Sequence, residues 1–335
     1  MARYLVTGVA GFIGARVAAR LLESGNEVLG LDNLNDAYDV RLKRLRLNTL
    51  QGVRGFRFTL GDVRDAETVS DATALARVFD MPSLGPIEAV FNLAARAGIW
   101  PSLAIPGEYL RTNVEGTLNL LELCKKAGIA RFILASSSSL YGDRNKVPFS
   151  EDDETDHALS PYAASKKAAE VLAYSYHHLY GVNVGTLRFF TVYGPAGRPD
   201  MSPLRFVRWI EEGKAVVING DGTQSRDFTF VDDVAEGTVS ALNVRGFEVI
   251  NLGFGGPVTL LDLIREIERA TGKKAKLDFR PVSPADMRAT WAETTKAKTL
   301  LGWSAKTELA EGIDRTVQWY RENRAALQEM SWDEA

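Results

Sequence analysis

Short apolar runs alternate with longer amphipathic stretches through the first 190 residues of this chain. We predict strands at Tyr4–Val6, Glu27–Leu31, Phe56–Leu60, Ala89–Leu93, Phe132–Ala135 and Asn183–Leu187. The intervening stretches carry apolar residues at helical spacing, the longest being Tyr109–Lys126 and Pro161–Tyr180. A regular alternation of strand and helix favours a parallel, doubly wound sheet with helices on both faces.

The regular alternation weakens after residue 190, where prolines and glycines become frequent. We therefore expect a dinucleotide-binding domain over residues 1–190, to which part of 225–255 returns. Residues 191–330 would form a smaller mixed α/β region that binds substrate. A loop is predicted at 82–86 from its two prolines and its glycine.

The composition excludes several classes of function. The 335 residues are 45% hydrophobic and 25% charged, with a net charge of -3, so no charge excess points to nucleic acid or to an anionic membrane. The single Cys124 and the spacing of the three histidines indicate neither a disulfide nor a metal site. With no secretory signal before the first strand and no apolar run long enough for a bilayer, we expect a cytoplasmic protein.

The densest basic run, Arg41 to Arg46, has leucines between its charges. This pattern predicts an amphipathic helix whose charged face is solvated.

Three glycines follow the first predicted strand, with the spacing G-x-x-G-x-x-G at Gly8, Gly11 and Gly14. Between a strand and a helix, such glycines allow a tight turn, a close approach to a pyrophosphate, and close packing at the helix N-terminus. We predict a Rossmann dinucleotide site here, with Phe12 and Ile13 among its residues.

Polar residues end the next two predicted strands. Asp32 lies 18 residues after Gly14, where a carboxylate accepts hydrogen bonds from an adenosine ribose and repels a 2'-phosphate. Asn33 follows without a neighbouring arginine, so NAD is favoured over NADP. Asp62, followed by Val63, is expected either to bind the adenine amino group or to cap the next helix.

The fourth predicted strand ends at Leu93, Ala94 and Ala95, small or apolar residues that let a dinucleotide lie close to the backbone. Asn113 is an amide inside an otherwise apolar helix pattern, and we count it with the cofactor-binding residues.

Tyr162 and Lys166 are four residues apart, so on a helix they share one face. An ammonium near a phenol lowers the pKa of the phenol from about 10. Such a tyrosine can accept a proton from a sugar hydroxyl. The serine run Ser136–Ser139 follows the fifth strand and supplies a hydroxyl for the same oxygen.

Together these stretches resemble the extended short-chain dehydrogenase/reductase family over nearly the whole chain, and within it the nucleotide-sugar 4-epimerases. The resemblance implies that Tyr162 removes the proton of the sugar 4-hydroxyl while the C4 hydride passes to tightly bound NAD. The 4-keto sugar then turns over and receives the hydride on its other face. In this family Lys166 supports Tyr162 and the nicotinamide ribose, and Ser137 is the catalytic serine or threonine.

The serine run also separates this chain from its relatives. The related 4,6-dehydratases carry an Asp-Glu pair where Ser138 and Ser139 stand, and the related decarboxylases carry Glu at Ser139. Without these carboxylates, the resemblance implies epimerisation alone.

The sugar is less clearly specified. Arg188 to Met201 and Tyr38 to Lys43 resemble UDP-glucuronate 4-epimerases, in which Ser138, Ser139, Thr191 and Arg198 would bind the C6 carboxylate. Those enzymes commonly have Arg where this chain has Trp100, which could instead stack on a neutral sugar. Thr290 matches the position at which a bulky Tyr blocks N-acetylated sugars in some epimerases, so the resemblance implies room for N-acetyl groups. UDP-glucuronate is thus favoured over UDP-glucose/galactose and their N-acetyl forms.

The resemblance also implies the position of the nucleotide and an assembly. Arg226 matches the residue that pairs with the diphosphate, with an ion pair to Asp227 or Asp232 as the alternative, and Val217 lies where the family binds uracil. The family forms homodimers through the helices expected at 109–126 and 161–180.

Overall fold

The computed structural model describes residues 1–70, 87–143, 146–281 and 287–332. The loop predicted at 82–86 lies outside this part of the chain.

A seven-stranded, fully parallel sheet forms the centre of the first region. All six predicted strands are present, and a seventh joins the sheet at its far edge. Their order across the sheet is β3 (Phe56–Leu60), β2 (Glu27–Asp32), β1 (Arg3–Thr7), β4 (Ala89–Asn92), β5 (Arg131–Ser137), β6 (Asn183–Phe189) and β11 (Phe247–Leu252). The chain direction across the sheet reverses between β1 and β4, where doubly wound folds bind their ligands. The predicted α/β doubly wound fold is confirmed.

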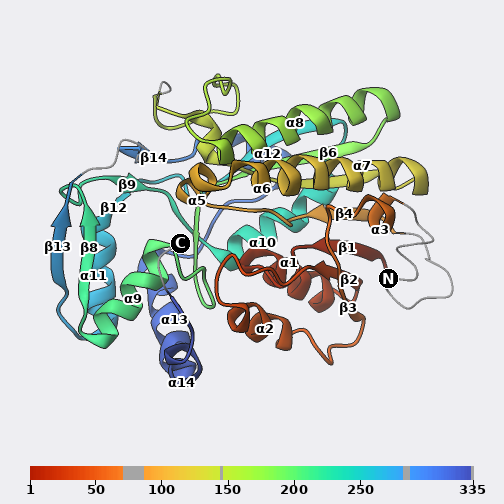
Figure 1. Cartoon of the computed structure of the whole chain (residues 1–335). Helices are drawn as coiled ribbons and strands as arrows, with labels where there is room; N and C mark the ends of the chain where they lie inside the picture. The colour runs from red at the N-terminus through yellow and green to blue at the C-terminus, as the bar shows by residue number, and fades with distance from the viewer. Residues whose placement is uncertain (71–86, 144–145, 282–286, 333–335) are drawn as a thin grey trace.

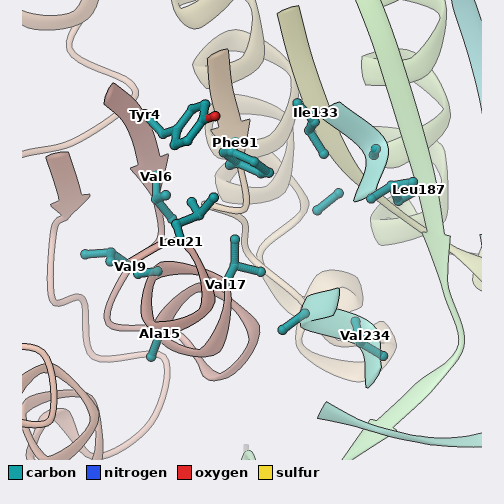
Figure 2. Packing of buried hydrophobic residues seen from close by; sticks show 14 of the residues in the cluster. Tyr4, Val6, Val9, Ala15, Val17, Leu21, Phe91, Ile133, Leu187 and Val234 are labelled. Carbon is teal, nitrogen blue, oxygen red and sulfur yellow. The ribbon is translucent and has the colours of Figure 1, made fainter. Parts of the chain in front are cut away.

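Helices cover both faces of this sheet (Figure 1). One face packs against α1 (Phe12–Glu23), α10 (Val231–Ser240) and α12 (Thr295–Leu301), and the other against α3 (Ala66–Ser70), α7 (Gly116–Ala127) and α8 (Pro161–Tyr180). Figure 2 shows the first of these cores, in which Val17 and Leu21, one turn apart on α1, point at Val6 and Phe91. Each such buried side chain contributes about 1.5–3 kcal/mol.

The long helix predicted at Tyr109–Lys126 is not continuous. It consists of α6 (Pro106–Leu110), a π-helical turn η1 (Arg111–Glu115) and then α7. Asn113 lies in the π turn, and its side chain bonds to the backbone of Arg96 and not to its own helix. Such turns are frequent at functional sites, because they redirect a side chain out of the regular helix.

The C-terminal region has a core of its own, built from α9 (Ser202–Glu212), α11 (Leu260–Thr271) and α13 (Leu309–Glu322). Short strands complete it in three small sheets. These are β8 (Ala215–Asn219) with β13 (Lys276–Arg280), β7 (Thr191–Tyr193) with β10 (Phe228–Phe230), and β9 (Ser225–Arg226) between β12 (Val258–Thr259) and β14 (Ala289–Thr290). The last helix is α14 (Arg324–Gln328). None of the helices in the described part of the chain has the length and apolarity to cross a membrane.

The basic run does form a helix, α2 (Val40–Asn48), but the prediction that its charges are solvated is wrong for two of them. Lys43 is 5% and Arg46 3% exposed, whereas Arg41 and Arg44 are exposed. The reason is that polar partners lie inside: Lys43 Nζ donates to Asn35 Oδ1 at 2.8 Å, and the Arg46 guanidinium donates to backbone carbonyls.

Candidate active site

Ser137 and Tyr162 come together where β5 ends and α8 begins. Ser160 caps α8 by accepting a hydrogen bond from Ala163 N at 3.2 Å, and Pro161 occupies the first turn. A serine cap followed by proline fixes the start of a helix, so Tyr162 is held in the first turn of α8. Its ring meets Tyr109 of α6 edge-on, with centroids 6.1 Å apart.

The pKa of Tyr162 is raised, mainly by burial, while a hydrogen bond from Ser137 and the charge of Arg198 act to lower it. This differs from the expectation that Lys166 lowers the pKa of the phenol. The reason is that the Lys166 ammonium donates to Ala135 O at 2.8 Å, on the β5 side of the helix. Burial lowers the pKa of Lys166 to about 8, against the opposing charge of Glu170.

Glu170 lies one further turn along α8 and is buried with Arg188 of β6. Arg188 donates twice to its carboxylate, at 3.0 and 2.9 Å, and Ser136 Oγ donates at 2.5 Å. This fork of charged hydrogen bonds fastens α8 to β5 and β6. Glu170 was not among the predicted site residues, although its spacing of four from Lys166 places it on the same helix face.

The glycine loop forms the close-packed cradle that its spacing predicts. Gly8 has φ +67°, and a Cβ there would lie 2.7 Å from Ala94 N, so only glycine lets this turn approach the end of β4. A Cβ on Gly11 or Gly14 would lie 2.9 or 2.1 Å from Gly8 O. Asp32 supports the same loop, accepting from Ala10 N at 3.0 Å and from Leu34 N at 2.8 Å.

Asp62 was expected either to bind the adenine amino group or to cap the next helix, and the structure decides the second alternative. Asp65, not Asp62, accepts from the Glu67 amide at the start of α3. Asp62 instead accepts from Arg64 and from Asn33 Nδ2, the latter at 2.9 Å, which links the ends of β2 and β3. Capping of α3 by Asp62 is therefore wrong. Val63 is buried, and a Cβ on Gly116 of α7 would lie 2.6 Å from its side chain.

Asn113 holds the segment that follows β4. Its amide donates to Arg96 O at 3.0 Å and to Ser165 Oγ at 2.9 Å, and its oxygen accepts from Arg96 N at 2.9 Å. Both amide protons are therefore used within the protein, next to Lys166. Leu93, Ala94 and Ala95 are half-buried in the segment so positioned.

On the sugar side, Arg198 lies close enough to Tyr162 for its charge to act on the phenol. Its Nε and Nη2 donate to the two oxygens of Asp200, at 3.0 and 2.5 Å, and Nη2 also reaches Ala97 O at 3.2 Å. The guanidinium is thus already paired. Ser138 and Ser139 are half-buried in a 3-10 turn, and Thr191 is half-buried at the start of β7.

The remaining predicted residues lie in the small sheets or on the surface. Arg226 of β9 and the buried Thr290 of β14 are register partners, whereas Val217 belongs to β8. Arg226 Nη1 donates to Ser225 O at 2.8 Å. Of its two proposed ion-pair partners, Asp232 binds Arg16 and Arg315, and Asp227 accepts from three backbone amides. Trp100, in the first turn of α5 (Ile99–Ala104), is 47% exposed.

Lys43 is a second residue that the sequence analysis left without a role. Burial lowers its pKa to about 8, while the charge of Asp32 opposes that shift. The signal was present in the sequence: Lys43 and Arg46 fall in the same helical stripe as Leu42, Leu47 and Leu50, all of which are buried. A charge in such a stripe indicates a buried polar partner.

Residues 4–253 match the model of the NAD dependent epimerase/dehydratase family. A UDP-glucuronate 4-epimerase of Thermodesulfobacterium geofontis is 51% identical over 324 residues, covering 96% of this chain and 97% of the relative.

Two solved structures are similar over nearly their whole length. The UDP-glucuronic acid 4-epimerase of Bacillus cereus, in complex with UDP-glucuronic acid and NAD, has a TM-score of 0.86 at 36% identity, covering 96% of this chain and 99% of that one. The UDP-glucose 4-epimerase of Thermotoga maritima with UDP-glucose has the same TM-score at 32% identity, and the same coverage.

Proposed function

The chain belongs to the NAD-dependent epimerase/dehydratase family, and we propose that it is an NAD-dependent UDP-glucuronate 4-epimerase that interconverts UDP-glucuronate and UDP-galacturonate. The observation that carries the proposal is the meeting of Tyr162 with Ser137 and Arg198. A phenol able to accept a proton lies beside a hydroxyl and beside a cation suited to an anionic sugar.

The residues of the glycine loop fit NAD. A cradle that any Cβ would fill leaves backbone amides at the N-terminus of α1 for a pyrophosphate. Asp32, at the end of β2, suits an adenosine ribose diol. When bound there, NAD supplies a hydride acceptor that is regenerated in each turnover, so the reaction is an isomerisation.

We assign the proton transfer to Tyr162. Its burial favours the neutral phenol, so nearby positive charge is needed for it to act as a base near neutral pH. Arg198 acts in this direction, although its pairing with Asp200 leaves it little net charge. Ser137 donates a hydrogen bond that stabilises the phenolate, and Lys166 is held in place by Ala135 O for the nicotinamide ribose.

The sugar carboxylate is assigned to the hydroxyls of Ser138, Ser139 and Thr191, with Arg198 beside them. Because Asp200 already pairs with Arg198, the guanidinium contributes direction more than net charge. Several neutral donors hold a carboxylate without a rigid ion pair, and this allows the ring to turn. Arg226 is assigned to the diphosphate, Val217 to the uracil, and Thr290 and Trp100 to the edge of the sugar site.

A second candidate is a 4-epimerase of UDP-glucose and UDP-galactose, extending to N-acetylated forms. Two observations favour it: Trp100 stands where the glucuronate enzymes carry arginine, and a UDP-glucose 4-epimerase has the same TM-score as the glucuronate enzyme.

Product analysis by proton NMR decides between the two. Purified protein is incubated separately with UDP-glucuronate and with UDP-glucose, without added NAD. Conversion of the glucuronate to UDP-galacturonate, with no UDP-pentose, is expected. Conversion of the neutral sugar alone would overturn the proposal in favour of the second candidate.

We also propose a homodimer and retain the domain division predicted at residue 190. Apolar side chains on α7 and α8 are exposed, including Leu118, Val171 and Tyr174, the last two at 55% and 53%. Pairing of these helices between two copies would cover them. Light scattering should give a molar mass twice that of the monomer, and the Val171→Asp variant should have the mass of one monomer. We also propose a cytoplasmic location, which cell fractionation would test.

A further inference from the structure

Arg46 of α2 joins the two loops between which the sugar and the cofactor would meet. Its Nε donates to Ala196 O at 2.8 Å and its Nη2 to Gly197 O at 2.9 Å. Its Nη1 donates to Ala10 O in the glycine loop at 3.4 Å and to Tyr38 Oη at 2.5 Å. A single buried side chain therefore bridges the cofactor loop and the loop that carries Arg198.

The loop that Arg46 holds has an unfavourable backbone. Ala196 has φ +57°, a strained value for a residue with a side chain, whereas glycine accommodates the φ of +144° at Gly194. A non-glycine residue is disfavoured in the left-handed region and persists there when the surroundings fix it. Arg46 Nε bonds to the carbonyl of Ala196 itself, so the guanidinium helps to fix this conformation, together with the turn hydrogen bond from Gly197 N to Gly194 O.

Arg198 follows this loop directly and depends on its path. Its guanidinium must reach both Asp200 and Ala97 O, and its charge must reach Tyr162. If the carbonyls of Ala196 and Gly197 moved, the Arg198 backbone would move with them.

We infer that Arg46 is a positioning residue that holds the 194–198 loop on the glycine loop, so that Arg198 is aimed at the sugar beside Tyr162. The inference rests on the proposed function for its kinetic test. Guanidinium geometry is required, because three donors spread over one plane reach carbonyls on two different loops. A lysine keeps the charge but has only one nitrogen.

The kinetic test is a double-mutant cycle of Arg46→Lys with Arg198→Ala, assayed with UDP-glucuronate. Arg46→Lys alone should raise KM roughly tenfold, with bound NAD per chain unchanged. In the Arg198→Ala background the same change should have less than about a twofold effect, because the group that Arg46 positions is gone. Arg44→Lys, on the exposed side of the same helix, is the matched control and should match the parent protein.

A purely structural role predicts a different pattern. In that case Arg46→Lys would lower thermal stability and reduce activity by the same factor with or without Arg198. Equal factors in the two backgrounds would overturn the inference. So would full recovery of KM on adding NAD, because Arg46 would then act on cofactor retention alone.

A second measurement needs no substrate and stays informative if the proposed function fails. Hydrogen exchange of the peptide containing residues 194–201 should be at least about tenfold faster in Arg46→Lys than in Arg44→Lys. The amides concerned include Gly197 N and Met201 N, which bond to Gly194 O and Arg198 O. Adding Ala196→Gly, which removes the positive-φ strain, should recover part of the protection. Unchanged exchange in Arg46→Lys would overturn the inference even if the enzyme acts on UDP-glucuronate.

Discussion

Two arginine–carboxylate pairs lie near α8, Arg188 with Glu170 and Arg198 with Asp200, and they differ in which parts of the chain they join. Arg188 and Glu170 come from β6 and α8 and are 4% and 5% exposed. Arg198 and Asp200 are two residues apart on one loop and are both 22% exposed. Both pairs are bidentate, so the difference lies in the elements that they connect and in burial.

This difference suits the two pairs to different roles: Arg188–Glu170, the fastening pair, holds elements together, and Arg198–Asp200 is available for sugar recognition. The Arg188–Glu170 pair is closed off from water and holds two elements together, and the charge of Glu170 also acts to raise the pKa of Lys166. The Arg198–Asp200 pair joins residues of one loop, and its partly exposed guanidinium also donates to Ala97 O and acts on Tyr162 through its charge. The same chemical group therefore joins two elements of the scaffold in one place and, in the function that we propose, serves the sugar site in the other.

Tyr162→Phe should have the largest effect, because it removes the group that both regions serve. We expect bound NAD to remain and epimerisation to fall roughly 10³–10⁴-fold, which is at the upper end for loss of a general base. The measurement is product formation from UDP-glucuronate together with NAD released on denaturation. Tyr174→Phe, on the exposed side of α8, is the control. Ordinary turnover by Tyr162→Phe would remove the tyrosine from the mechanism.

Glu170→Gln breaks the fastening pair. Removing one partner of a buried ion pair leaves an uncompensated charge on Arg188, and we expect a loss of about 3–5 kcal/mol in the free energy of unfolding. Urea denaturation measures this. Asp200→Asn is the matched change in the other pair and should cost less than about 1 kcal/mol. Equal losses would mean that the two pairs do not differ as argued.

The two regions also differ in how far sequence predicts them. The parallel doubly wound sheet and the glycine cradle follow from periodicity and from spacing that fixes local geometry, whereas the order of the strands was not predicted. The placement of Ser137 beside Tyr162 was expected from the family resemblance. Pairing of Arg188 with Glu170 was not predicted, because both lie within regular elements and only the sheet order brings them together. Burial of Arg46 was not predicted, although the helical stripe that it shares with Leu42 and Leu47 indicated it. Its partners could not be predicted, because they are backbone carbonyls of loops 36 and 151 residues away in the sequence.

The π turn at Asn113 was missed for a similar reason. Its sequence has an ordinary helical pattern, and the distortion is stabilised by partners outside the helix, Arg96 and Ser165. Sequence therefore predicted that Ser137 lies beside Tyr162, but not the buried polar contacts that hold these elements in place.

Arg198→Ala sharpens the recognition side of the comparison. A hydrogen bond to a charged group contributes about 1.5–3 kcal/mol, so kcat/KM for UDP-glucuronate should fall roughly 10–100-fold. For UDP-glucose the fall in kcat/KM should stay below about threefold, because this sugar has no carboxylate for Arg198 to bind. Equal losses for the two sugars would assign Arg198 to the shape of the loop and leave carboxylate binding to Ser138, Ser139 and Thr191.

Lys166→Met tests the charge of the buried lysine next to the Arg188–Glu170 pair. Its effect on the pH dependence of the free energy of unfolding should be the smallest of the effects that we predict. The folded pKa of Lys166 is about 8, against 10.5 for a free lysine, because burial disfavours the ammonium. Between these values the unfolded chain binds more protons than the folded one, so stability rises with pH. Below pH 8 the folded protein carries the full cost of the buried charge.

The parent protein should therefore gain stability relative to Lys166→Met on going from pH 8 to pH 9, by about 1 kcal/mol. Lys43, whose pKa is also lowered to about 8, is present in both proteins and cancels in the difference. Lys126→Met, an exposed lysine on α7, should show no such change. A difference that stays constant across this range would mean that Lys166 remains charged, held by Ala135 O and by the field of Glu170. The fastening pair would then also set the charge of the catalytic lysine, and Glu170→Gln should lower turnover as well as stability.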